Sequence, residues 1–375
     1  MAVHETQAKS ILRRQKKIDS WFISQYGMNL YRRCMHNCIY CDGRAEKYQV
    51  SGTFGQAIDV KTNALGVLKK EMSLRRRQKF YNHGYIMIGG GVGDSYQPVE
   101  EHYKLTRKVL KFISSLNLPI HILTKSILIQ RDLDLLHEIN ENSQVLLSFS
   151  FSSTNDRISR VFEPGVPPPS ERLDLIRQLK SEGFHCGIFL LPLIPFITDT
   201  ALILRQTIAD FDALDVDYII FGGMTLKHGR QMDYFYQTIK KHYPDLISSY
   251  SQIYKGSKWG NATSTYYQSI HQSLCEIIKH YPIPTRIPLS FFTDIINDDT
   301  RVMILLEHMD YFLKLKGRKS PFGYAAYQIG QLKQPLVTMK HRLQDIKGVG
   351  PVTERIIKEI LEKKTCSYYE QVLNA

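Results

Sequence analysis

The feature of this 375-residue sequence that most constrains its fold is a sixfold alternation of strand-like and helix-like segments between residues 24 and 222. The strand candidates are 24–30, 84–90, 119–124, 144–151, 184–191 and 217–222. The helical stretches between them are 61–79, 98–116, 131–140, 170–182 and 199–214. Strands that alternate with helices form parallel sheets through right-handed crossovers. The pattern therefore predicts an α/β fold, either an open doubly wound sheet or a full or partial barrel.

Residue types suited to binding and catalysis follow directly after each predicted strand. In chain order they are Cys34, Cys38, Cys41, Gly89, Gly90, Gly91, Asp94, Thr124, Lys125, Ser148, Ser150, Ser152, Pro192, Pro195, Gly222 and Gly223. In a parallel barrel the active residues cluster just beyond the carboxyl ends of the strands. A partial (β/α)6, TIM-like barrel of six strands explains this convergence best.

The rest of the chain is expected to be helical, so that the fold is a partial barrel with a helical carboxy-terminal extension. We assign residues 1–230 to a core domain and residues 231–335, rich in tyrosine, to a helical and irregular extension. Residues 336–375 are expected to form a separate unit. A chain of this length has room for one large domain and a small appendage.

Three of the six cysteines, Cys34, Cys38 and Cys41, have the spacing CxxxCxxC. Clustered cysteines in a chain without a secretory signal more often bind metal than form disulfides. Three thiolates on one loop can bind three irons of a [4Fe–4S] cluster, and the fourth iron is then open to chelate the amino and carboxylate groups of S-adenosylmethionine (SAM). The spacing, placed after the first strand of a β/α series, favours these two cofactors.

Two alternatives remain open for the cysteine loop. Zinc could take the three sulfurs together with His36, because Zn²⁺ accepts three cysteines and one histidine in a tetrahedral site. Structural zinc sites usually combine two CxxC pairs, however, and this chain has no second pair. The other alternative is that the cysteines are free thiols.

At this loop the sequence resembles the radical SAM superfamily, and more narrowly its spore photoproduct lyase-like branch. The similar segments are 8–12, 29–34, 93–100, 124–126, 131–132, 163–164, 172–173 and 192–195, so the resemblance covers about residues 8–225. It implies a radical SAM core in which SAM lies across the carboxyl ends of the strands. It also implies reductive cleavage of SAM at the cluster to a 5′-deoxyadenosyl radical, with an electron from a reductant such as flavodoxin or ferredoxin.

The resemblance further implies a set of SAM-contacting residues, namely Tyr40, Gly89, Gly90, Gly91, Lys125, Ser148, Ser150 and Arg172. The glycines would lie beside the methionyl amino group, where a side chain would obstruct it, and the tyrosine near the cluster and adenine. The serines would meet the ribose or the carboxylate, and the lysine or the arginine would hold the carboxylate. A simpler interpretation stays open for each, such as a turn at the glycines or an ion pair between Arg172 and Glu163.

Two positions depart from spore photoproduct lyase itself. A cysteine after the cluster loop of that enzyme returns hydrogen to the repaired thymine, whereas this chain has no cysteine between Cys41 and Cys186. Asp42 stands where a tyrosine usually follows the last cluster cysteine. We expect Cys186 to be a buried structural thiol, and the reaction to be a radical modification other than repair of that particular lesion.

Residues 343–361 resemble a helix-hairpin-helix motif, with two short helices joined by a Gly-Val-Gly turn and Pro351 in the first turn of the second helix. Glycines let the backbone approach a phosphate, and the free amides at a helix start point toward it. The residues expected to contact phosphates are Lys347, Gly348, Gly350, Arg355 and Lys358. An apolar seam of Ile346, Val349, Ile356, Ile357 and Ile360 would hold the motif together. The alternative is a helical cap or a partner contact.

The net charge of +13 suggests a polyanionic partner. One basic run consists of Lys69, Lys70, Arg75, Arg76, Arg77 and Lys79, and another lies in the last forty residues. Together with the hairpin, the charge favours nucleic acid, and DNA by analogy. We therefore expect a radical SAM enzyme, lyase-like, in DNA repair or base modification. The alternatives are a protein or small-molecule substrate, or a non-catalytic iron–sulfur protein that binds nucleic acid.

A membrane location is not expected. The longest apolar run, 186–197, is too short to span a bilayer and contains Pro192 and Pro195. Residues 1–17 have no apolar core of a secretory signal, so the sequence predicts a cytoplasmic protein.

Overall fold

A computed structural model describes residues 2–48, 54–73, 80 and 82–374. Arg75, Arg76, Arg77 and Lys79 of the first basic run lie outside these residues. In the described part of the chain, no helix has the length and apolar character needed to cross a bilayer.

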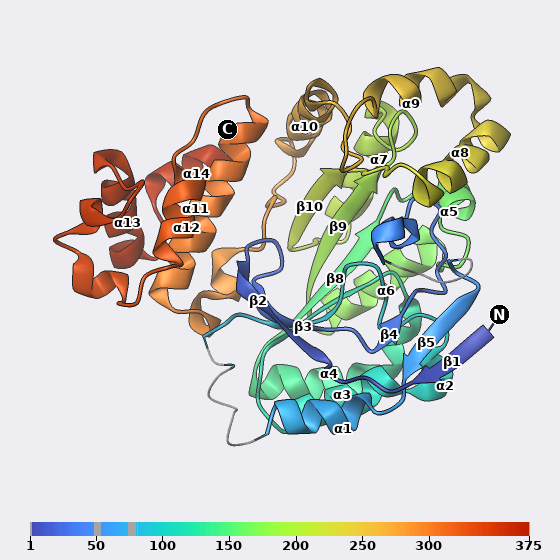
Figure 1. The fold of residues 1–375 in the computed structure, drawn as a ribbon, viewed down its shortest axis with the longest axis horizontal. Helices are drawn as coiled ribbons and strands as arrows, with labels where there is room; N and C mark the ends of the chain where they lie inside the picture. Colours follow the sequence, from blue (N-terminus) through green and yellow to red (C-terminus); the bar gives the residue numbers. More distant parts are fainter. Residues whose placement is uncertain (1, 49–53, 74–79, 81, 375) are drawn as a thin grey trace.

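The centre of the molecule is a seven-stranded sheet that curls into a half barrel (Figure 1). Its strands are β2 (Leu12–Asp19), β3 (Ser24–Met28), β6 (Ile86–Gly89), β7 (Ile120–Thr124), β8 (Val145–Phe151), β9 (His185–Leu193) and β10 (Tyr218–Gly223). The order is β10-β9-β8-β7-β6-β3-β2, and β2 alone is antiparallel to its neighbour. The six parallel strands are the six predicted ones, which confirms the partial barrel.

Helices follow the parallel strands as crossovers and cover the outside of the sheet (Figure 1). They are α1 (Ala64–Glu71), α2 (Glu100–Tyr103), α3 (Leu105–Ser114), α4 (Leu133–Asn142), α5 (Asp156–Phe162), α6 (Pro169–Ser181) and α7 (Ala201–Asp212). The helix predicted over 98–116 is broken at Lys104, whose φ is +52°. The buried Glu100 carboxylate explains the break, because it accepts hydrogen bonds from the amides of Thr106 and Arg107 at the start of α3.

A second, three-stranded sheet was not expected from the sequence. Its strands are β1 (Ala2–Thr6), β5 (Ala57–Lys61) and β4 (Tyr31–Arg32), in the order β1-β5-β4. Short 3-10 helices lie between the main elements: η1 (Asp42–Arg44), η2 (Glu46–Tyr48), η4 (Ile127–Asp132), η5 (Pro244–Leu246), η6 (Leu289–Phe291), η7 (Thr293–Ile295), η8 (Leu336–Met339) and η9 (Leu343–Asp345).

The segment after the barrel is helical, as expected. It contains α8 (Arg230–His242), α9 (Ile247–Ile253), α10 (Ser264–Ile278), α11 (Asp298–Leu315), α12 (Phe322–Ile329), α13 (Pro351–Lys363) and α14 (Ser367–Asn374). Helices α11 to α14 share one apolar core and stand beside the barrel (Figure 1). The expected boundary at residue 336 falls inside this core, because α11 and α12 contribute to it.

Two contacts tie α11 to the amino-terminal edge of the barrel. The ring of His308 is hydrogen-bonded through Nε2 to the carbonyl oxygen of Ser20 at 2.8 Å, and through Nδ1 to the Tyr369 hydroxyl at 3.0 Å. Lys17 on β2 forms an ion pair with Glu307. The carboxy-terminal helices are therefore held against the turn that joins β2 to β3.

Candidate active site

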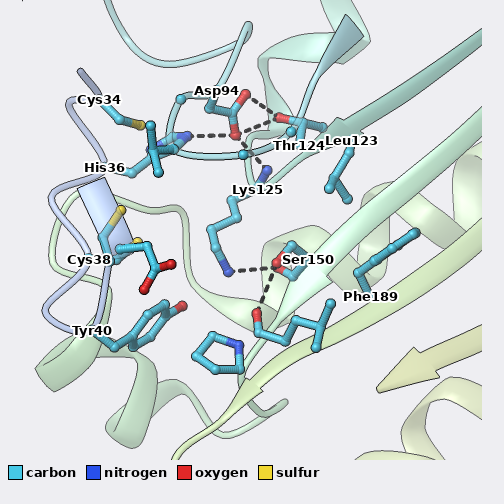
Figure 2. Close-up of a pocket in the computed structure, with 18 of the residues that line it drawn as sticks. Cys34, His36, Cys38, Tyr40, Asp94, Leu123, Thr124, Lys125, Ser150 and Phe189 are labelled. Atoms are coloured by element: carbon cyan, nitrogen blue, oxygen red, sulfur yellow. Dashed lines mark hydrogen bonds and ion pairs between the residues drawn. The ribbon is translucent and has the colours of Figure 1, made fainter. Parts of the chain in front are cut away.

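A cavity of about 320 Å³ opens at the carboxyl ends of the parallel strands, within the size range of small-molecule sites. The cysteine loop forms one wall, and the ends of β7, β8 and β9 lie opposite (Figure 2). The residues predicted from the sequence that line this cavity are Cys34, Cys38, Tyr40, Cys41, Gly90, Gly91, Lys125 and Ser150. Gly89, Ser148 and Arg172 do not line it.

Backbone contacts from distant segments hold the cysteine loop in place. The Gln97 side chain accepts a hydrogen bond from the Met35 amide at 2.8 Å and donates one to the Arg33 carbonyl at 3.2 Å. The Ile39 amide donates to the carbonyl of Phe162 at 2.8 Å. The loop is thus fixed from both the β6 and the β8 sides of the barrel.

The three thiols face a low-dielectric environment. Burial raises the pKa of Cys34 and Cys41, and it raises the pKa of Cys38 to about 12. The thiolate is the form that binds metal, and bound metal supplies the positive charge that stabilises it. We therefore expect loading of this loop with metal to release protons.

The zinc alternative conflicts with the position of His36. Its Nδ1 is hydrogen-bonded to the Gly165 carbonyl at 2.9 Å, and its Nε2 pairs with the Asp94 carboxylate at 3.1 Å. Both ring nitrogens are therefore engaged within the protein. Among the described residues, no three His, Cys, Asp or Glu side chains lie close enough to share one metal ion. A cubane needs no such proximity, because each cysteine binds a separate iron.

The wall next to the cysteine loop is shaped to admit a ligand. Gly90 and Gly91 have φ values of +89° and +70°, a backbone conformation that favours glycine. A β-carbon at Gly91 would meet no atom within 4 Å, so the space beside it belongs to the cavity. Three cysteines on one loop beside this open glycine turn fit a cluster that binds SAM. The residues that would hold the cluster are Cys34, Cys38 and Cys41.

Asp94 links the cysteine loop to the end of β7. Besides His36, it accepts hydrogen bonds from the Thr124 hydroxyl and the Lys125 amide, both at 2.8 Å (Figure 2). Burial opposes its ionisation, but the hydrogen bonds from His36, Lys125 and Tyr96 hold the pKa of the Asp94 carboxyl below its usual value. The carboxylate therefore stays charged and keeps His36 in place.

Glu163, which the sequence did not predict as a site residue, is the centre of a buried polar cluster. Its carboxylate accepts hydrogen bonds from the Tyr40 hydroxyl, from the Lys125 ammonium at 2.9 Å and from the Arg172 guanidinium at 3.0 Å. Burial would raise the pKa of Glu163, but the charges of Lys125 and Arg172 lower it to about 2. The cluster fixes Tyr40 and Lys125 at the cavity wall. Two features of the sequence pointed to Glu163: the Glu163–Pro164 segment is similar to the family, and an ion pair between Arg172 and Glu163 was the simpler interpretation of Arg172.

Two expected cofactor contacts lie below the cavity floor. Ser148 is fully buried and hydrogen-bonded at 2.6 Å to both His121 Nε2 and the Tyr218 hydroxyl. A β-carbon on Gly89 would stand 2.5 Å from the Leu123 carbonyl oxygen, so this glycine serves strand packing. Successive side chains along β8 point to opposite faces of the sheet, so Ser148 and Ser150, two residues apart, point to the same face. Ser150 lies at the end of the strand and lines the cavity, whereas Ser148 lies deeper in the barrel.

The cavity also has walls that the sequence did not predict. Apolar side chains come from Phe22, Phe54, Leu123, Phe189, Leu191 and Met224. Asp42 lines it as well and binds the Lys227 ammonium at 2.6 Å and the Thr225 hydroxyl at 2.7 Å. These bonds join the cysteine loop to the segment after β10. Cys186 is fully buried in β9 and does not line the cavity.

Comparisons with known proteins agree with this geometry. Residues 28–204 match the model of the Radical SAM superfamily. An uncharacterised protein of Mycobacterium tuberculosis is 27% identical over 282 residues, which cover 74% of this chain and 80% of the relative. An uncharacterised protein of Methanocaldococcus jannaschii is 27% identical over 223 residues, covering 59% of this chain and 78% of that protein.

Solved structures of similar fold include spore photoproduct lyase complexed with dinucleoside spore photoproduct, with a TM-score of 0.55 and 16% identity. A variant of that enzyme with bound AdoMet and the same dinucleoside has a TM-score of 0.52 and 17% identity. Each alignment covers 75% of this chain and 79% of the other. Residues 28–204 thus match a radical SAM domain, and this match, the similar fold and the cysteine loop together support a radical SAM enzyme that uses a [4Fe–4S] cluster and SAM.

Proposed function

We propose that this radical SAM enzyme acts on nucleic acid, with DNA favoured, in a lyase-like repair or base-modification reaction. The observation that carries the proposal is the exposed turn before α13, which combines glycines, aromatic side chains and cations that have no partner among the described residues. The similarity in fold to an enzyme whose bound ligand is a dinucleoside supports it.

The turn has the backbone geometry expected of a phosphate contact. Gly348 has a φ of +83°, and a β-carbon there would stand 2.5 Å from the Tyr324 ring. Gly350 is exposed, has open space beside it and directly precedes Pro351 at the start of α13. The apolar seam is buried as the motif requires. The first helix of the motif is reduced to the single 3-10 turn η9, because only three residues separate Arg342 from the extended Ile346.

Charge around this turn favours an anionic partner. Lys347 and Arg355 are exposed and form no hydrogen bond or ion pair within the described residues, whereas Lys358 pairs with Glu354 at 2.7 Å. Residues 316–364 contain eleven Lys or Arg and four Asp or Glu. This segment therefore has a net charge of +7, about half of the net charge of +13 of the whole chain. Contacts of this kind neutralise phosphates without reading sequence.

Two exposed tyrosines extend the same surface. Tyr324 and Tyr327 lie one turn apart on α12 and are 52% and 57% exposed. Tyr324 lies next to Gly348, so its ring stands beside the turn. Aromatic rings next to a basic surface offer stacking platforms for bases.

The residues of this chain that line the cavity bind and orient the ligand, and they exclude water from it. When bound, the cluster and SAM supply a carbon-centred radical that abstracts hydrogen from a substrate. We propose that Gly90 and Gly91 admit the methionyl group and that Lys125, which Glu163 holds in place, meets its carboxylate. Phenylalanines at 22, 54 and 189 keep the reaction space apolar.

The test is DNA binding at rising salt by anaerobically reconstituted protein. The logarithm of the affinity should fall with a slope of about −0.9 per neutralised phosphate. Gly350→Asp should weaken binding at least about tenfold without changing SAM cleavage. Leu202→Asp on α7 is the control for the added charge, because Leu202 is 79% exposed and lies outside both basic runs. Absence of DNA binding at low salt would favour a protein or small-molecule substrate.

Product analysis with damaged and undamaged oligonucleotides then identifies the reaction. We expect 5′-deoxyadenosine from the reduced enzyme with SAM, and an altered base in one of the oligonucleotides. Intact cluster without SAM cleavage would instead indicate a non-catalytic iron–sulfur protein.

A further inference from the structure

The structure buries a cation directly behind the cysteine loop. Arg44, in η1, is 4% exposed. Its Nε donates to the Cys38 carbonyl at 3.0 Å, and one Nη donates to the carbonyl and the side-chain oxygen of Asn37 at 3.0 and 2.6 Å. The guanidinium lies 3.7 Å from the centre of the Tyr234 ring and 5.0 Å from that of Phe54.

No carboxylate balances this charge in the part of the chain that the structure describes. The two acids beside Arg44 in sequence bind other cations, since Asp42 pairs with Lys227 and Glu46 with Arg230. Removing an ion from water costs several kcal/mol unless an opposite charge or strong hydrogen bonds compensate. Neutral carbonyls and aromatic faces supply part of that compensation. A negative charge beside the cysteine loop would complete that compensation for Arg44.

We infer that the counter-charge of Arg44 is the thiolate-bound cluster itself, and that Arg44 is a positioning residue that makes the cluster easier to reduce. The [4Fe–4S]²⁺ core with three cysteine thiolates carries a net negative charge, and one electron from an external flavodoxin- or ferredoxin-type reductant adds another. A cation in a low-dielectric setting favours the added electron. The inference goes beyond the proposed function, because it concerns the cofactor and holds for any substrate.

Arg286 provides a matched control at a different place in the fold. It is also buried, 3% exposed, and has no carboxylate within 4.0 Å among the described residues. Its guanidinium lies 4.5 to 5.1 Å from the rings of Phe312, Tyr311 and Trp21, none of which lines the cavity. Replacing it tests the general effect of removing a buried cation.

The experiment is a redox titration of the reconstituted enzyme, followed by the electron paramagnetic resonance signal of the reduced cluster. Arg44→Met should decrease the equilibrium constant for reduction at least about tenfold, which equals a fall of about 59 mV in potential. Arg44→Lys should keep a potential close to that of the wild type, and Arg286→Met should leave it unchanged.

Thermal unfolding before and after reconstitution gives a second readout. Cluster loading should raise the melting temperature of the wild type more than that of Arg44→Met, because the variant lacks the charge that the cluster balances. Equal potentials in Arg44→Met and the wild type would overturn the inference. Loss of the cluster from both Arg44→Met and Arg44→Lys would also overturn it. The role of Arg44 would then be to hold the cysteine loop through its hydrogen bonds to Cys38 and Asn37, and its charge would not be the essential feature. Neither result depends on binding of nucleic acid.

Discussion

Replacement of Glu163 by glutamine should destabilise the protein by about 3 kcal/mol. Glu163→Gln keeps the size of the side chain but leaves the Lys125 and Arg172 cations without their shared counter-charge. All three side chains are mostly or fully buried, with 0% exposure for Glu163 and Arg172 and 14% for Lys125. Removing one partner of a buried ion pair typically costs about 3–5 kcal/mol.

The pKa of Glu163 gives a second route to the same magnitude. It is lowered from 4.5 to about 2 in the folded protein, and each unit corresponds to about 1.4 kcal/mol. A group whose pKa is lower in the folded state stabilises the fold fully above its unfolded pKa. This stabilisation is lost as the pH falls from about 4.5 toward 2. The difference between wild type and Glu163→Gln should therefore be full at pH 7 and decrease steadily below pH 4.5.

Urea denaturation followed by circular dichroism, at several pH values, measures both effects. The control is Asp174→Asn, which removes a carboxylate from an exposed pair with Arg177 on α6 and should change the free energy of unfolding by less than about 0.5 kcal/mol. A loss below about 1 kcal/mol in Glu163→Gln, or a loss that is the same at pH 7 and pH 3, would refute the reasoning.

Three further predictions concern the cofactor, the nucleic acid and the carboxy-terminal core. Cys38→Ala should lose the brown chromophore after anaerobic reconstitution, whereas Cys186→Ala should keep it; a full absorbance in the first variant would contradict the ligand assignment. Lys347→Gln should reduce the salt slope of DNA binding by about 1, measured by filter binding, and an unchanged slope would remove this residue from the interface. Ile357→Ala should cost about 2–5 kcal/mol of unfolding free energy, while the exposed Val352→Ala should cost less than about 0.5.

The parallel strands were predictable because buried parallel strands are continuous apolar runs. Strand β8 is buried at six of its seven residues, and its sequence shows this directly. Strand β2 reads Leu-Arg-Arg-Gln-Lys-Lys-Ile-Asp and is mostly exposed, so it has no apolar pattern by which to find it. The edge position explains why so polar a segment can pair.

The sequence predicted the cysteine loop from one short segment, and it predicted Gly90, Gly91, Lys125 and Ser150 from the convergence of the strand ends. The cysteines share one loop, and their spacing alone identifies them. The Glu163 cluster joins residues 40, 125, 163 and 172, which only the folded half barrel brings together. Similarly, the break at Lys104 depends on where the Glu100 carboxylate is buried, and helical periodicity carries no information about that. Contacts between distant residues are the part that sequence reasoning could not reach.

The attachment of α11 to the barrel has a consequence for any long substrate. Because the His308 ring bridges Ser20 and Tyr369, the helices that carry the surface near α13 are attached to the same barrel that forms the cavity. An enzyme that binds a polymer at one surface and reacts with it at another then modifies a position at a constant distance from the bound segment. If this protein binds nucleic acid as proposed above, footprinting of the bound strand would reveal that distance as a fixed number of nucleotides.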